Sequence, residues 1–290
     1  MGLRLKFNVV LLAVFVVGLA TAGAISWSLL QKSARDEVIR NAGLMMEAAI
    51  AVRGYTVSQV KPHLDEKLAQ VFLPQTIPAY AATETFNALR KTHPEYSYKE
   101  ATLNPTNPRD RAVEWEADVV NSFRNQAELK ELMGERDTPT GRSLYIARPI
   151  KITNPACLVC HSVPAAAPPT MIKIYGEANG FGWQLNEIVG AQVVQVPMTY
   201  PIENAKKAFT TFMASLFGVF LAVFVVLNVM LDAIIVRPIA QMSAAADKIS
   251  VGDFDVPEFK ESGKDEVGRL AASFNRMRRS LEQALKLIDS

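Results

Sequence analysis

Two long apolar runs divide this chain into segments of different character. No charged residue occurs from Phe7 to Leu30, and a second uncharged run extends from Phe209 to Leu231. Each run reaches the roughly 20 residues that a helix needs to cross the hydrocarbon core of a bilayer. We therefore predict transmembrane helices over residues 7–31 and 209–235, with a folded domain over residues 32–208 between them.

Basic residues beside the two runs indicate the orientation. Arg4 and Lys6 precede the first run and Arg237 follows the second, which places both outer ends in the cytoplasm by the positive-inside rule. Lys206 and Lys207, just before the second run, weaken this argument. The prediction is a two-pass protein of the bacterial inner membrane with a periplasmic domain.

The first apolar run has an alternative interpretation as a cleaved secretory signal. The small residues of Thr21–Ala24 resemble a cleavage site. The run is longer than the roughly 7–15 apolar residues typical of such signals, so an uncleaved anchor is favoured. In both cases the segment that follows is exported.

Periodicity in the exported segment predicts helices first and strands later. The expected helices cover residues 34–60, 84–91 and 115–132, and the expected strands cover residues 143–148, 171–175 and 188–198. Helices followed by antiparallel strands indicate an α+β fold of the PAS-like sensor type.

Heptad spacing replaces the apolar run after residue 235. The first predicted seam is Ile239, Met242, Ala246 and Ile249, and the second is Val267, Leu270, Phe274, Met277, Leu281, Ala284 and Ile288. A connector over residues 250–264 joins them. Two such helices cannot bury both seams alone, so we expect them to pair with a second copy of the chain.

The candidate chemistry lies in one pentapeptide, Cys157-Leu158-Val159-Cys160-His161. Two thiols three positions apart can form thioethers with the two vinyl groups of one porphyrin, and the adjacent His161 is placed to bind the iron from the proximal side. The chain has only 2 Cys and 3 His in all. The motif therefore predicts one covalently attached haem c.

Two other interpretations of the pentapeptide stay open. A thioredoxin-like redox pair normally lies in a βαβ unit at a helix N-terminus, whereas Pro155 before the motif and Pro164 after it indicate a loop. A zinc site needs four ligands, so His63 or His93 would have to join the motif through folding.

The second axial ligand of the haem has several candidates. Met46, beside Met45 on the first exported helix, offers a thioether, and His63 or His93 offers an imidazole. A Met at helical spacing is more often core filling, and His63 after Pro62 is more often a surface residue. An open or water-bound distal position is therefore the leading expectation. Arg53 and Tyr55 are candidates for hydrogen bonds to a haem propionate or a distal ligand. The alternative, that they make ordinary surface pairs or anchor the core, is favoured.

The segment after the second run resembles a HAMP domain over about residues 232–285. The resemblance is carried by Val236–Ile239, by Gly252–Phe254 and by Asp265–Gly268 at the start of the second helix. It implies an all-α parallel coiled coil, a four-helix bundle in a homodimer, which we expect to fill residues 236–290. A plain juxtamembrane coiled coil is the alternative.

The exported segment resembles the family of PAS-like c-type haem sensor domains over about residues 35–205. The matching motifs are Val52–Thr56, Val60–Pro62, Cys157–His161, Asn179–Trp183, Gly190–Val194 and Val196–Pro197. Some members of that family use a cysteine as the second axial ligand. This chain has no third cysteine, so it departs from that pattern.

The sequence as a whole predicts a membrane-anchored, homodimeric haem sensor. We expect a redox change or a small gas to be sensed, and the signal to pass through the HAMP domain to a separate cytoplasmic protein such as a histidine kinase. Rival hypotheses are a membrane-tethered electron-transfer cytochrome and an accessory subunit of a membrane complex. No catalytic constellation is apparent, so we expect no enzyme; the formal charge of +2 carries little information about partners, and we expect no nucleic-acid ligand.

Overall fold

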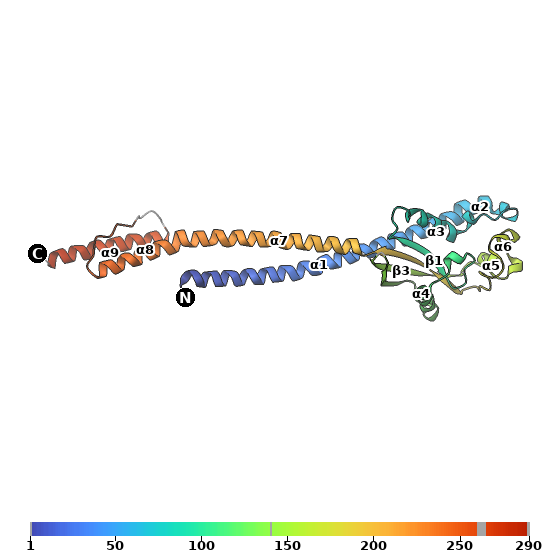
Figure 1. Ribbon diagram of the computed structural model, residues 1–290, viewed down its shortest axis with the longest axis horizontal. Helices are drawn as coiled ribbons and strands as arrows, with labels where there is room; N and C mark the ends of the chain where they lie inside the picture. The colour runs from blue at the N-terminus through green and yellow to red at the C-terminus, as the bar shows by residue number, and fades with distance from the viewer. Residues whose placement is uncertain (1, 140, 260–264, 289–290) are drawn as a thin grey trace. The chain divides into compact units, whose positions relative to one another are not determined.

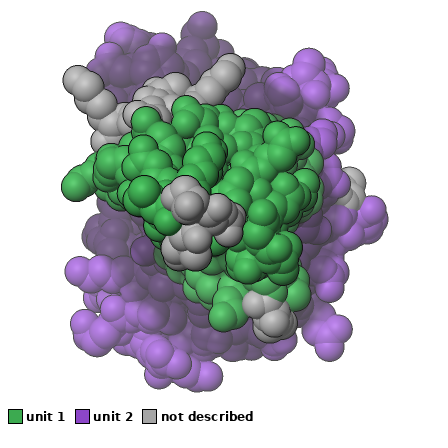
Figure 2. All heavy atoms as spheres, turned by 90° about the vertical axis from the view of Figure 1, so that its left-hand side faces the viewer, with its two compact units in different colours: residues 1–28, 208–290 green, residues 29–207 purple. Residues whose placement is uncertain are grey.

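A computed structural model describes residues 2–139, 141–259 and 265–288. The described chain forms two compact units, which Figure 2 shows in different colours. Residues 29–207 make up the first, which we call the sheet domain, and residues 1–28 with 208–290 make up the second, the helical unit. Each is described by itself.

A four-stranded antiparallel sheet forms the centre of the sheet domain. Its strand order is β1-β4-β3-β2, with β1 at Ser97–Thr102, β2 at Leu132–Thr138, β3 at Gly141–Lys151 and β4 at Ile188–Pro197. The Val-rich strand β4 pairs with β1 on one side and β3 on the other, and it is buried along almost its whole length. This burial suits the β-branched residues that favour strands.

Helices cover both faces of this sheet (Figure 1). Helix α1 (Leu3–Tyr55) and helix α3 (Pro78–Leu89) pack on one face, where Val194 and Val196 of β4 point. Helix α4 (Glu114–Asn125) packs on the other face against Val193. The alternation of neighbouring β4 residues between two cores follows from the two-residue period of a strand.

Short helical turns gather at one end of the sheet domain (Figure 1). After α1 the chain forms a π-helix at Thr56–Val60 and helix α2 at Lys61–Leu64, followed by a 3-10 turn. Helices α5 (Leu158–His161) and α6 (Pro169–Tyr175) lie in the same region, where the Thr170 hydroxyl donates to the carbonyl of Leu68 at 2.7 Å.

The predicted pattern of helices and strands agrees with the structure in outline, but it was wrong in three places. Residues 171–175, expected as a strand, belong to helix α6, because Pro168 and Pro169 fix the backbone for a helix start. The third expected helix ends at Asn125 rather than 132. Strands β1 and β2 were missed because they lie at the two sheet edges and read as polar, SYKEAT and LMGERDT.

The sheet domain passes directly into the next helix. Strand β4 ends at Pro197 and helix α7 begins at Thr199, so Met198 alone joins them. Met198 is buried, and its N–H donates to the carbonyl of Arg142 at 2.9 Å.

The helical unit contains two helices that are long and apolar enough to cross a membrane, by length and composition. They are the first part of α1 and the later part of α7 (Thr199–Met230), which a π-helix at Leu231–Val236 continues, so helical structure covers both predicted ranges, 7–31 and 209–235. Phe15 stacks on Phe220 with ring centroids 4.8 Å apart, and Trp27 meets Phe209 edge to face at 5.2 Å.

Two amphipathic helices follow in the region predicted as HAMP. Helix α8 (Arg237–Ser250) and helix α9 (Glu266–Ile288) are separated by a connector, of which residues 260–264 lie outside the described part, as do residues 289–290 of the predicted domain. Met242 and Ile249 of the first seam are buried, but Leu270, Met277 and Leu281 of the second are exposed in the single chain.

Candidate functional site

The Cys-x-x-Cys-His motif spans the end of a 3-10 turn and the short helix α5 that follows it. Asn154 caps the preceding 3-10 turn at Pro155–Cys157, its side chain accepting from the Ala156 N–H at 2.9 Å, and α5 follows at once. The expectation of a plain loop was therefore wrong: the prolines begin short helical turns instead of preventing them. Cys157 is the last residue of the 3-10 turn, and α5 carries Cys160 and His161.

The fold around the motif argues against a thioredoxin-like pair. The motif connects β3 to β4, and these two strands are antiparallel neighbours, so the segment is not the parallel βαβ unit of that class. Burial, the largest influence, raises the pKa of the Cys160 thiol; Lys61 opposes this and Cys157 adds to it. A raised pKa keeps the thiol protonated, the opposite of an activated redox thiol.

The described residues also give no support to the zinc alternative. Within residues 2–139, 141–259 and 265–288, no group of three or more His, Cys, Asp or Glu side chains is placed to hold a metal ion. His63 is exposed on α2, and His93 lies in an exposed turn beside Glu95.

His161 is held by three neighbours. Its Nδ1 lies 2.7 Å from the carbonyl oxygen of Gly180 and 3.4 Å from the hydroxyl of Thr106. Its ring stacks on Trp183, with centroids 3.9 Å apart and planes inclined by 13°. When Nδ1 carries the proton and donates it to the Gly180 carbonyl, Nε2 has a free lone pair. Nε2 is therefore the atom that a metal would bind.

The environment of His161 favours the neutral imidazole. Desolvation lowers its pKa from the ordinary value, and the hydrogen bond to Gly180 acts in the opposite direction but is the smaller influence. Neutral imidazole is the form that coordinates a metal ion, because the lone pair must be free of a proton.

Apolar side chains surround the motif. Cys160 packs against the cluster of Phe72, Ala167 and Met171, to which Phe181 also belongs. Val159 inside the motif is 58% exposed. Val163 and Ile174 are each 54% exposed. Two free thiols, an imidazole with one free nitrogen and uncovered apolar surface fit a covalently bound porphyrin, whose flat faces need such contacts.

The structure separates the distal candidates from one another. Met46 is fully buried in the core between α1 and the sheet, a different cluster from the one that contains Cys160. His63 is exposed on α2, next to Lys61, whose charge influences Cys160. No contact joins Met46 or His63 to His161 in the described chain, and their roles as ligands stay predictions.

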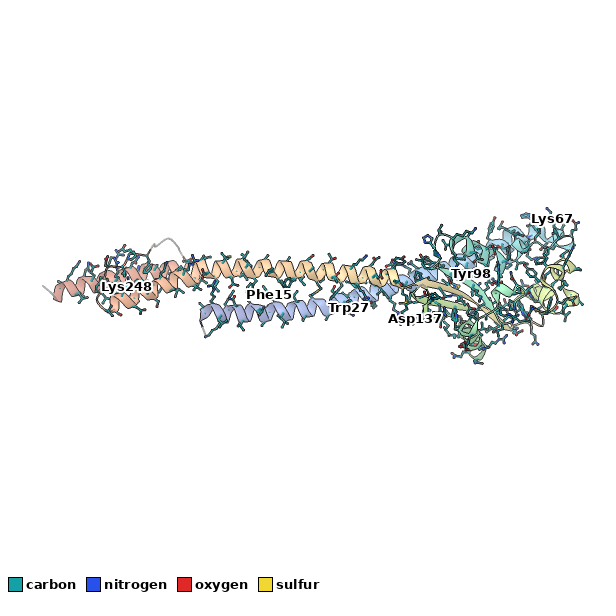
Figure 3. The ribbon with its side chains drawn as sticks, in the orientation of Figure 1. Phe15, Trp27, Lys67, Tyr98, Asp137 and Lys248 are labelled. Atoms are coloured by element: carbon teal, nitrogen blue, oxygen red, sulfur yellow. The ribbon has the colours of Figure 1, made fainter. Side chains whose placement is uncertain are left out.

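Arg53 and Tyr55 have different surroundings. The Arg53 guanidinium binds both carboxylate oxygens of Glu100, whereas Tyr55 is 62% exposed. The buried Tyr98, which is labelled in Figure 3, donates a hydrogen bond to Glu100 at 2.8 Å. Arg53 is thus already paired with a buried carboxylate, which the sequence did not reveal.

No contact with His161 was predicted for the residues around it, although Asn179–Trp183 is one of the motifs that carry the family resemblance. Gly180 and Trp183 lie in the turn between α6 and β4, and Asn104 and Thr106 lie in the connection after β1. The available signal was the run Asn104-Pro105-Thr106-Asn107-Pro108, which is unusually rich in turn residues for a mere connection.

Asp110, in the connection between β1 and α4, has a carboxyl group with a raised pKa. Its side chain is 17% exposed and lies 3.5 Å from Arg109 Nε. Burial raises its pKa from 3.8 to about 6; Arg109 opposes this, and Glu100 adds to it. The folded state therefore binds this proton more tightly than the unfolded state does, so its ionisation lowers stability as the pH rises from about 4 to about 6.

We expect Asp110→Asn to stabilise the protein at pH 7 by at most about 3 kcal/mol, because the amide removes the cost of ionising a buried carboxyl. Near pH 4 the gain should disappear, since Asp110 is then protonated in the folded state. Urea unfolding at both pH values measures the difference. Equal gains in stability at the two pH values would contradict the raised pKa of Asp110.

The protein has a domain with helices on both faces of an antiparallel sheet, and this domain carries a Cys-x-x-Cys-His motif. Comparison with known families shows to which family such a domain belongs. The family model Tll0287-like: Tll0287 matches residues 31–197, more than half of the chain. The protein therefore belongs to the Tll0287-like family. A HAMP domain model matches residues 227–283, which confirms the predicted HAMP domain.

Several curated proteins are similar over shorter segments. Sensor histidine kinase WalK of Bacillus subtilis is 32% identical over 117 residues, covering 40% of this chain and 19% of WalK. Heme sensor protein HssS of Staphylococcus aureus is 37% identical over 90 residues, covering 31% and 20%. A putative sensory transducer protein of Acetivibrio thermocellus is 33% identical over 89 residues, covering 30% and 16%. The chain spans a fifth or less of the length of these relatives.

One solved structure is also similar. The crystal structure of the cyanobacterial heme-protein Tll0287 covers 56% of this chain and 95% of its own, with 16% sequence identity and a TM-score of 0.43.

Proposed function

We propose that this protein is a membrane-anchored sensor that holds one haem c and relays a redox or small-gas signal through its HAMP domain to a cytoplasmic partner. The observation that carries the proposal is the placement of Cys157, Cys160 and His161 on two consecutive short helical turns, with His161 Nδ1 hydrogen-bonded to the Gly180 carbonyl. The combination of a Tll0287-like domain with a HAMP domain supports a sensory role.

Cys157 and Cys160 are the proposed points of covalent attachment. Each S–H bond adds across one vinyl C=C bond of the porphyrin: sulfur forms the new S–C bond, and the thiol proton goes to the other vinyl carbon. The addition needs no oxidant. Both cysteines are free thiols, as this chemistry requires.

When bound, the haem supplies an iron whose oxidation state or ligation by a gas differs between two conditions. His161 is the proposed proximal ligand, and an open or water-bound distal position is the leading proposal. Met46 and His63 remain the candidates for a sixth ligand from the chain. Differential stabilisation of two protein conformations by the two haem states is what would make the domain a sensor.

The proposed topology places the sheet domain in the periplasm and the HAMP domain in the cytoplasm, in a homodimer. The two candidate membrane spans and the basic residues outside them support the topology. The exposed second seam supports pairing with a second copy, because Leu270, Met277 and Leu281 lack cover in the single chain. Partners of the histidine-kinase or sensory-transducer kind are proposed, since proteins with those names share similar segments.

The test is an absorption spectrum of the full-length protein, produced with c-haem maturation machinery and measured in oxidised, reduced and carbon monoxide-treated forms. Haem that survives denaturation and whose reduced spectrum shifts with carbon monoxide is the expected result. Covalent haem without a shift would favour a redox sensor or an electron-transfer cytochrome. Absence of covalent haem would overturn the proposal.

A second readout separates the sensor from an accessory subunit. In the holoprotein both native thiols are taken up by haem, so Leu270→Cys provides a single reactive thiol for a bismaleimide crosslinker. Crosslinked homodimers in membranes, with an efficiency that changes when carbon monoxide is added to the reduced protein, are expected. Arg269→Cys, next to it but outside the predicted seam, is the matched control. Crosslinking only to a different protein would favour the accessory subunit.

A further inference from the structure

The turn that contacts His161 lies along the Cys-x-x-Cys-His helix and is bonded to it by backbone groups. The Gly182 N–H donates to the Ser162 carbonyl at 2.9 Å, and the Trp183 N–H donates to the His161 carbonyl at 3.2 Å. These bonds fix the C-terminal end of the turn, at Gly182 and Trp183. The N-terminal end, at Gly180, needs other contacts if the Gly180 carbonyl is to keep one direction.

Asn104 fixes the N-terminal end from outside the turn. Its Oδ1 accepts from the Gly180 N–H at 3.2 Å, and its Nδ2 donates to the Phe181 carbonyl at 3.3 Å. Only one orientation of the carboxamide satisfies both bonds, because one partner is a donor and the other an acceptor. The two bonds flank the Gly180 carbonyl, the group that accepts from His161 Nδ1.

Thr106 lies directly against Gly180 and explains why a glycine occupies this position. Gly180 has φ +84°, and a Cβ at this position would lie 2.1 Å from Thr106 Oγ1 and 2.8 Å from Thr106 Cα. Such distances leave no room for a side chain, and positive φ is the region that glycine tolerates. The backbone of the turn therefore sits directly against the segment that carries Asn104.

Asn104 itself has a rigid base. It lies two residues after the end of β1, and the intervening Leu103 N–H donates to the Val189 carbonyl of β4 at 3.3 Å. A second tie runs from Arg111 Nη2 to Asn179 Oδ1 at 2.9 Å. The sheet thus fixes Asn104, and Asn104 fixes the carbonyl that His161 meets.

We infer that Asn104 is a positioning residue that sets the strength of the His161–Gly180 hydrogen bond and, through it, the reduction potential of the haem. The inference rests on the proposed function. A strong bond from Nδ1–H to a carbonyl makes Nε2 a better electron donor, which favours the ferric iron. Loss of the Asn104 clamp lets the Gly180 carbonyl move away, weakens that bond and favours the ferrous iron.

The experiment compares holoproteins of the wild type, Asn104→Ala and Asn107→Ala by potentiometric titration. Asn107 is the matched control because it lies in the same connection, where its side chain accepts from the Arg109 N–H at 3.2 Å. We expect Asn104→Ala to shift the ferric–ferrous equilibrium toward the ferrous form by about tenfold, or about 59 mV for one electron. Asn107→Ala should leave it unchanged.

A second readout follows the hydrogen bond itself. In ¹⁵N-histidine-labelled reduced holoprotein, the exchange rate of the His161 Nδ1 proton with solvent is measured by NMR. Faster exchange in Asn104→Ala, with the Asn107→Ala rate unchanged, is the expected result, and a residue that merely stabilised the fold would not produce it at a temperature where all variants are folded.

The outcomes separate the inference from the proposed function. Covalent haem with an unchanged potential and unchanged exchange in Asn104→Ala overturns the inference alone, whereas a wild-type chain without covalent haem overturns both. Asn104→Ser, which cannot span both bonds, replaces Asn104→Ala if that variant does not fold. If neither folds while Asn107→Ala does, Asn104 serves folding instead of His161, and the inference is wrong.

Discussion

The double variant Cys157→Ser/Cys160→Ser will carry no haem that resists extraction with acidified acetone. Each serine removes one sulfur nucleophile, and a hydroxyl does not add to a porphyrin vinyl group under the same conditions. Each single variant keeps one thioether, so part of its haem stays attached. One vinyl group then remains conjugated with the ring, and the absorption of the reduced haem moves to longer wavelength.

Mass spectrometry of the intact chain gives the most direct measurement. The wild type should gain the mass of one haem, and the double variant should gain none. Ser162→Ala, immediately after the motif, is the control and should keep the full addition. A double variant that still holds covalent haem would show that attachment uses another group, and a wild type without added mass would contradict the c-type assignment.

Arg53→Met is the substitution for which we expect the largest loss of stability. Arg53 pairs with Glu100, whose side chain is 5% exposed, and Tyr98 is the other hydrogen-bond donor to that carboxylate. Glu100 also contributes to raising the pKa of Tyr98, behind burial as the leading cause. Removing the guanidinium leaves a buried charge without its counter-ion, which costs about 3–5 kcal/mol.

The double variant Arg53→Met/Glu100→Gln tests that reason. It removes both charges, so it should be distinctly more stable than Arg53→Met alone. Arg148→Met is the matched control: Arg148 pairs with Glu47 and Glu131, its side chain is 30% exposed, and its loss should cost no more than about 1 kcal/mol. Urea unfolding of the full chain in detergent, followed by tryptophan fluorescence, gives all three values. Equal losses for the two arginine variants would contradict the argument.

The parts of the molecule that follow from local patterns were predictable. Composition and periodicity predict the two apolar runs, the helices on either side of the connector and the long Val-rich strand. The HAMP match confirms the region that contains the two helices and the connector. Residues 171–175 of α6 were mistaken for a strand because a short, mostly apolar segment is compatible with either structure.

The contacts around His161 were not predictable in the same way. Asn104 lies 76 positions before Gly180 in the chain, Thr106 lies almost as far away, and only the pairing of β1 with β4 brings their segments together. The same pairing explains Glu100, which reads as a surface residue in the strand SYKEAT until α1 covers that face of the sheet. A single sequence carries periodicity, but it does not carry strand order.

The short junction after β4 fixes how the start of helix α7 is rotated about its own axis. Because Met198 is buried and bonded to Arg142, no slack exists between the last strand and α7. Each residue of an α-helix turns the chain by about 100°, so one inserted residue at this junction would present a different face of α7 to whatever lies beside it. The direction in which the first turn of α7 leaves the sheet domain is therefore fixed by the end of β4.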